Sequence, residues 1–151
     1  MSSTFKKKEK TPEALLERLK NATSPDDYFE LFEDLWTLIM GIISKADADA
    51  GTRTQAIDQF GTLSGRFYLL IDAYKIALEH DFSYKDNLHD EIEDVLKKLI
   101  EVYARLKKGE SLRKAIDTIS WTSLSAHDAI RDFMNRLAEM IEDLSPRPYY
   151  W

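Results

Sequence analysis

The sequence contains no cysteine, which excludes disulfides, thiolate metal sites and cysteine nucleophiles. It has only four prolines and five glycines in 151 residues, and nearly all of them fall where helices are expected to begin or end. The longest apolar runs, LIMGII and FYLLI, are far shorter than the roughly 20 residues that span a bilayer. These absences predict a soluble, cytoplasmic protein of one domain.

The net charge of −6 is unevenly distributed. Residues 1–24 carry six Lys and Arg against three Glu, whereas residues 25–50 carry seven Asp and Glu against one Lys. An acidic chain disfavours broad binding to nucleic acids, which requires a positive field to neutralise phosphates. The lysines of residues 1–11 could contact an anionic partner, but such a segment is more typical of a flexible basic leader.

Apolar residues recur with the 3-4 spacing of amphipathic helices, and alternation typical of strands never persists over five residues. Four long segments show the helical pattern: 25–48, 52–79, 86–107 and 122–144. Two shorter helices are expected over about 12–21 and 111–119. The sequence therefore predicts an all-α fold, a bundle of four long amphipathic helices plus one or two short ones, over residues 12–145.

Local signals place several helix ends. Thr11 and Ser24 each precede a proline, so their hydroxyls are expected to cap helices whose first residue is that proline. Gly51 and Gly109 follow apolar periodic segments and are expected to terminate helices.

Gly61 and Gly65 lie four residues apart inside the segment 52–79, hence on one helix face. Each lowers helix stability by about 1 kcal/mol relative to alanine, so a compensating role is expected. Tight packing within the chain is the favoured interpretation. A helix break near residue 61 and a contact between subunits remain the alternatives.

Two aromatic features indicate an interaction surface. Trp36 widens the apolar face of the segment 25–48 beyond 100°, so that helix is either central or partly covered by a partner. The chain ends in Tyr149, Tyr150 and Trp151, and the prolines of residues 146–151 should hold this aromatic tail extended. We expect the three rings to be ordered, either on a groove of the same chain or on a neighbouring subunit.

The three histidines are each followed by aspartate, which raises the possibility of a metal site. His89, Asp90 and Glu93 could converge on one cation, because residues three and four apart share a helix face. No HExxH pattern is present. Acidic residues at the start of a helix and basic residues at its end are explained more simply by the helix dipole. His127 is expected in the first turn of the last long helix.

A second metal hypothesis rests on two carboxylate pairs, Glu30 with Glu33 and Glu91 with Asp94. Their ExxE and ExxD spacings, together with the stretch EIEDVLKKLIEVYARL, resemble the all-α nucleotide pyrophosphohydrolases of the MazG type. The resemblance implies a magnesium-dependent enzyme in which all four carboxylates face one another across the bundle. The gap of 57 residues between the pairs is longer than is usual in that family.

A third pattern is LKKLIEVYARLKKGES followed by RDFMNRLAEMIEDL. It is similar in outline to the small helical subunits of type III CRISPR effector complexes. That resemblance implies a subunit that stacks along an RNA-loaded filament, with Arg105, Lys107 and Lys108 as local contacts. The acidic balance of the chain counts against it.

No motif for nucleophilic catalysis or for a phosphate-binding loop is present, and no cofactor is predicted. The serines near His127 are interpreted as helix caps. The sequence thus favours a non-catalytic interaction protein, a homo-oligomer or a subunit of a larger intracellular assembly. Its partner would be another protein or a second copy, not a membrane.

Overall fold

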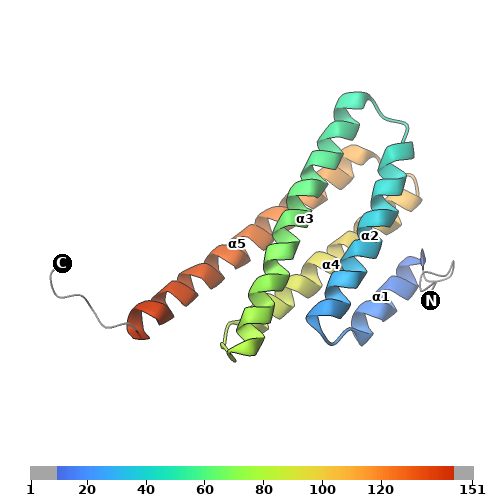
Figure 1. Ribbon diagram of the computed structural model, residues 1–151. Coiled ribbons are helices and arrows are strands. Elements are labelled where there is room, and N and C mark those ends of the chain that lie inside the picture. Colours follow the sequence, from blue (N-terminus) through green and yellow to red (C-terminus); the bar gives the residue numbers. More distant parts are fainter. Residues whose placement is uncertain (1–9, 145–151) are drawn as a thin grey trace.

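The computed structural model describes residues 10–144, and every regular element in that range is an α-helix (Figure 1). The five helices are α1 (Pro12–Asn21), α2 (Pro25–Lys45), α3 (Ala50–Glu79), α4 (Lys85–Lys107) and α5 (Leu112–Leu144). The prediction of an all-α fold is confirmed.

The predicted caps of α1 and α2 are present. The hydroxyl of Thr11 accepts a hydrogen bond from the backbone N–H of Ala14 at 3.1 Å. Ser24 and Asp27 form a reciprocal capping box, in which each side chain accepts from the backbone N–H of the other residue. Gly109, with φ of +95°, follows the end of α4 as predicted, because this left-handed conformation favours glycine.

The prediction that Gly51 terminates a helix was wrong. Gly51 lies in the first turn of α3, whose N-cap is Asp49. The Asp49 carboxylate accepts the backbone N–H of Thr52 at 2.7 Å, and this bond lowers the pKa of Asp49. Because the aspartate satisfies an otherwise unpaired N–H group, the helix begins before the glycine.

Residues 111–119 and 122–144 were expected to form separate helices, but α5 is continuous. The polar residues between them are satisfied without breaking the helix. The Thr122 hydroxyl donates to the carbonyl oxygen of Thr118 at 2.8 Å, and Ser123 accepts from Arg66 of α3. The serines here are not caps, and His127 lies in the middle of a helix rather than in a first turn.

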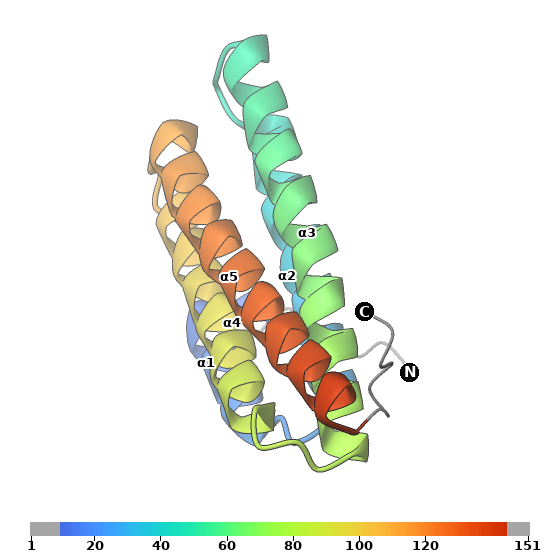
Figure 2. The same cartoon turned by 90° about the vertical axis from the view of Figure 1, so that its left-hand side faces the viewer.

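The helices form two layers. Helices α1, α4 and α5 lie in one layer, and α2 and α3 lie in the other (Figure 2). Helix α4 contacts all four other helices and is therefore the central one. The broad apolar face of α2 is covered by α1, α3 and α4.

The core lies between the two layers and is rich in aromatic side chains. Phe32 of α2 stacks on Phe67 of α3, with ring centroids 4.2 Å apart and planes within 9°. Phe60 meets Phe32 edge to face at 6.4 Å. From the other layer, Ile119 and the rest of the buried stripe of α5 complete this core.

Candidate interaction surface

The carboxylate pair on α2 faces neighbouring helices, not α4. The Tyr68 hydroxyl of α3 donates to Glu33 at 2.6 Å, and this hydrogen bond raises the pKa of Tyr68. Glu30 is exposed beside Arg18 of α1. Both carboxylates of this pair are therefore directed to the outer surface of the α2 layer.

The pair on α4 faces other elements. The Ser125 hydroxyl of α5 donates to Glu91 at 2.8 Å, and burial between the helices raises the pKa of Glu91. Asp94 lies 3.8 Å from Lys98 on its own helix. Thus the structure does not bring the two pairs together. Within residues 10–144, no three His, Asp or Glu side chains gather closely enough to hold a metal ion.

His89 belongs to a contact between α2 and α4. Its Nε2 lies 2.9 Å from the hydroxyl oxygen of Tyr28 and 3.6 Å from a carboxylate oxygen of Glu93. Its Nδ1 lies 3.5 Å from Asp90. Burial and the Glu93 charge raise the pKa of Tyr28 to about 12, so the tyrosine stays protonated at neutral pH. The helix-dipole interpretation is confirmed at the end of α4, where Arg105 and Lys107 lie in the last turn. It needs correction at the start, since α4 begins at Lys85 and the acidic residues from Asp90 onward lie beyond the first turn.

Gly61 and Gly65 lie on the exposed face of α3. A Cβ atom placed on either glycine would have no atom within 4 Å outside its own helical neighbourhood. Neither tight packing within the chain nor a helix break near residue 61 occurs, because α3 is continuous and the glycines face outward. A contact with another subunit stays a prediction.

Trp36 is half-buried on α2 and packs against Phe60 of α3, with ring centroids 4.6 Å apart. Much of this ring is therefore already engaged within the chain. The aromatic tail with Tyr149, Tyr150 and Trp151 lies outside the described residues, as does the basic leader up to residue 9.

Arg105 and Lys107, which were considered for nucleic-acid contact, have partners on α4. Arg105 pairs with Glu101 at 2.5 Å, one helical turn earlier. The Lys107 ammonium lies 5.2 Å from the centroid of the Tyr103 ring. These are short-range contacts on the surface of one helix.

Helices α3 and α5 run in parallel, and a series of hydrogen bonds joins their N-terminal halves. Arg113 donates to Gln55 at 3.1 Å and to the hydroxyl of Thr52 at 3.3 Å. Ser120 donates to Gln59 at 3.1 Å. We call this region the closed seam.

Arg66 and Ser123 form the last of these bonds along the two helices. The Arg66 guanidinium donates to the hydroxyl oxygen of Ser123 at 2.8 Å and to its carbonyl oxygen at 3.2 Å. Ser123 is buried, so the arginine satisfies polar atoms that water does not reach. The closed seam thus ends in a charge-assisted contact.

Beyond Ser123 the same edges of the two helices become apolar and exposed. The edge of α3 continues through Leu69 and Ile76, which are 55% and 40% exposed. The edge of α5 continues at a seven-residue spacing from Arg113 and Ser120 through the exposed His127, and it is apolar from Met134 to Ile141, which are 54% and 56% exposed. We call Leu69, Ile76, Met134 and Ile141 the open seam.

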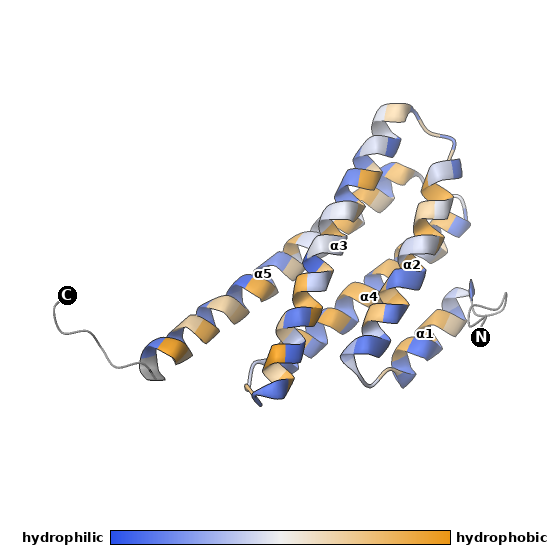
Figure 3. Ribbon diagram, viewed as in Figure 1, coloured by the Kyte–Doolittle hydropathy of each residue, from blue (hydrophilic) through white to orange (hydrophobic). Residues whose placement is uncertain are grey.

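The open seam exists because α5 diverges from α3 toward its C-terminal end (Figure 1). The apolar stripe of α5 does not stop where this divergence begins, and apolar residues continue to the end of the helix (Figure 3). Phe133 is still buried, whereas Met134, Met140 and Ile141 are exposed. Apolar residues thus continue along α5 beyond the part of the helix that is buried.

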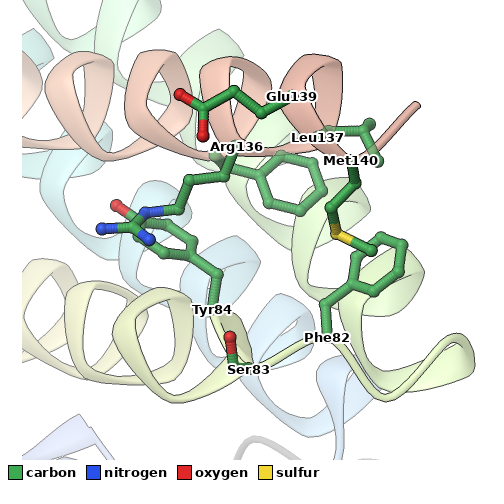
Figure 4. A pocket seen from close by; sticks show the side chains of 8 residues that line it. Phe82, Ser83, Tyr84, Arg136, Leu137, Glu139 and Met140 are labelled. Carbon is green, nitrogen blue, oxygen red and sulfur yellow. The ribbon is translucent and has the colours of Figure 1, made fainter. Parts of the chain in front are cut away.

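A loop covers the other side of this part of α5. Phe82 and Tyr84, which connect α3 to α4, line a pocket of about 170 Å³ with Leu137 and Met140 of α5 (Figure 4). The Arg136 guanidinium lies over the Tyr84 ring, 5.0 Å from its centroid. This contact holds the loop against one flank of α5, and Met134 and Ile141 do not line the pocket beneath it.

A second exposed apolar group lies on the outward face of α5. Trp121 is 73% exposed, and Leu124 beside it is also exposed. Exposed single apolar residues are ordinary on protein surfaces, but tryptophan and methionine are enriched in protein interfaces. Sequence reasoning missed both this group and the open seam. The sequence did contain a signal: Trp121, Met134 and Ile141 fall outside the apolar 3-4 series that predicts the core-facing side of the last long helix.

In the part of the chain that the structure describes, no helix is long and apolar enough to cross a membrane. The chain matches no protein-family model, and no curated protein or solved structure resembles it significantly.

Proposed function

We propose that this protein is a non-catalytic interaction protein that works as a homo-oligomer or as a subunit of a larger assembly. The observation that carries this proposal is the exposed apolar side chains of α5, with Trp121 and Leu124 on its outward face and Met134 and Ile141 in the open seam. A monomer gains no stability from placing such side chains in water, whereas a partner that covers them gains the free energy of their burial.

Contacts within the chain support the non-catalytic part of the proposal. The side chains first considered for metal chemistry have structural partners, as Glu33 has Tyr68 and Glu91 has Ser125. His89 is engaged with Tyr28 and links α2 to α4. Each of these polar groups has a packing role that requires no substrate.

The proposal is tested with the full chain by two measurements. Sedimentation analysis over a range of concentrations should show a mass that rises with concentration, or a stable oligomer. Thermal unfolding in the presence of Mg²⁺, Mn²⁺ and nucleoside triphosphates should show no stabilisation, since a ligand that binds the native state raises its stability by mass action. A clear metal- or nucleotide-dependent stabilisation would contradict the proposal and favour a pyrophosphohydrolase.

A further inference from the structure

We infer that the open seam is a contact between two copies of this chain, in which the C-terminal parts of their α5 helices pack antiparallel. This inference rests on the proposed function and names the partner and the surface. It concerns the flank of α5 formed by Met134 and Ile141, which the loop with Tyr84 leaves uncovered.

The spacing of residues on this flank suits a symmetric pair. Met134, Ala138 and Ile141 follow one another at intervals of four and three, so they lie along one face of the helix. Ala138 is exposed and stands between the two large side chains. With a two-fold axis beside Ala138, the small side chain allows close approach, and Met134 of each copy meets Ile141 of the other.

The charges beside this face select the antiparallel direction. Arg131 and Glu142 border the same flank at its two ends, and both are exposed. In an antiparallel pair Arg131 of each copy lies across from Glu142 of the other, so the symmetry generates two opposite-charge contacts. A parallel pair would instead place arginine opposite arginine and glutamate opposite glutamate.

The divergence of α5 from α3 gives the second helix a place to lie. Leu69 and Ile76 form the α3 side of the open seam, so a helix packed on Met134 and Ile141 also approaches these two side chains. Hydrogen bonds join α3 to α5 in the closed seam. In the open seam, apolar side chains of the second copy take their place. A small apolar contact with two ion pairs at its rim corresponds to a reversible dimer rather than to an obligate one.

Charge exchange between copies tests the inference by sedimentation of the full chain. Arg131→Glu places Glu against Glu at both rim positions, and Glu142→Arg places Arg against Arg. Each variant alone should self-associate about tenfold more weakly than the wild type, with the difference shrinking at high salt. An equimolar mixture of the two variants should recover association, because both rim contacts then join opposite charges.

The mixture also serves as an internal control. Arg131 pairs with Asp128 on its own helix at 3.3 Å, and Arg131→Glu removes this pair in the mixture as well as alone. Recovery in the mixture therefore reports a contact between chains. If the wild type self-associates but the mixture does so no better than either variant, the antiparallel contact is refuted while the proposed function stands.

Apolar variants locate the surface independently. The double variant Met134→Ser with Ile141→Ser should weaken association by at least about tenfold without lowering the thermal midpoint, because both side chains are already exposed. Trp121→Ser with Leu124→Ser, on the outward face of the same helix, is the matched control and should leave self-association unchanged. If the Trp121 and Leu124 variant weakens association and the Met134 and Ile141 variant does not, the contact lies on the outward face and the inference is overturned.

A wild-type chain that stays monomeric at every concentration would also overturn it. If a chain ending at Leu144 then dimerises, residues 145–151 of the same chain occupy the open seam in place of a second copy. If it does not, the open seam binds no copy of this chain. In either case the metal and nucleotide series still tests the proposed function separately.

Discussion

The two halves of the α3–α5 contact differ in chemistry and in burial, although they lie along the same helix edges. In the closed seam, Arg66 and Arg113 bond the neighbouring helix, and Ile119 is fully buried beneath them. In the open seam, Leu69 and Met134 carry no polar group that would fix a partner, and both are exposed.

In the α3–α5 contact, polar residues join the helices where they lie close together, and apolar residues are exposed where the helices diverge. Hydrogen bonds have fixed geometry, so Ser120 with Gln59 and Ser123 with Arg66 define both the distance and the register of the helices. Apolar contacts have no such direction and can be completed by any apolar surface. The closed seam therefore fixes the register of α3 and α5, whereas the open seam leaves apolar side chains exposed.

The largest effect is expected when one isoleucine is replaced in each part of α5, Ile119 beside the closed seam and Ile141 in the open seam. Ile119→Ala should lower the free energy of unfolding by about 2–5 kcal/mol, because it leaves a cavity under the closed seam. Ile141→Ala should change it by no more than about 0.5 kcal/mol, because that side chain is more than half exposed. Chemical denaturation of dilute, monomeric protein measures both. Equal losses would contradict the division of α5 into a buried and an open part.

The next test removes the arginine at the boundary of the two halves. Arg66→Met should cost about 1–3 kcal/mol, since the buried Ser123 hydroxyl then loses a charged donor. Arg105→Met is the matched control. Arg105 pairs with Glu101 across one turn of α4, at half-exposed positions, and its loss should cost about 0.5 kcal/mol or less. If the two variants are equally stable, the Arg66–Ser123 contact does not hold the seam closed.

A smaller effect, of opposite sign, is expected on the outer face of α3. Gly61→Ala and Gly65→Ala should each stabilise the monomer by about 1 kcal/mol, because both glycines are exposed in a helix and the added methyl group meets no atom. Gly109→Ala is the control and should destabilise, since Gly109 has a φ of +95°. A lower melting temperature for Gly61→Ala would show that the helix surface is covered after all.

Some features of this fold could be predicted from the sequence, and others could not. Caps at Thr11 and Ser24 and the terminating Gly109 were predicted correctly, because each depends on a few neighbouring residues. The continuity of α5 could not be derived in that way. The run around Thr122 contains residues with low helix propensity, and it is held helical by α3, from a part of the chain about 60 residues away.

The candidate site was less predictable than the fold. The carboxylate pairs share the spacing of a known metal motif, yet the direction of Glu33 and Glu91 depends on which helices neighbour α2 and α4. The same is true of Met134 and Ile141, since helical periodicity gives a face but not whether that face is covered. Coverage depends on where α5 diverges from α3, which is a property of the whole packing.

The smallest expected effect concerns Glu91, which joins α4 to α5 on the side opposite the seam. Burial raises the pKa of its carboxyl group above the ordinary value, so the folded chain binds the proton more tightly than the unfolded chain. Between these two pKa values the folded state carries more protons, and its stability falls as pH rises through that interval. The contribution of Glu91 is thus fully present below the pKa of the unfolded state and is lost as pH rises through the raised pKa of the folded state.

Glu91→Gln should remove this part of the pH dependence. Glutamine keeps an acceptor oxygen for the Ser125 hydroxyl, which donates to Glu91 at 2.8 Å, and it carries no charge to desolvate. Urea unfolding from about pH 4 to about pH 7 should give a shallower decline for the variant than for the wild type, and a variant at least as stable as the wild type at the upper end. A variant that is less stable at neutral pH would mean that the ionised carboxylate itself supports the α4–α5 contact, and that this layer, like the closed seam, depends on charge.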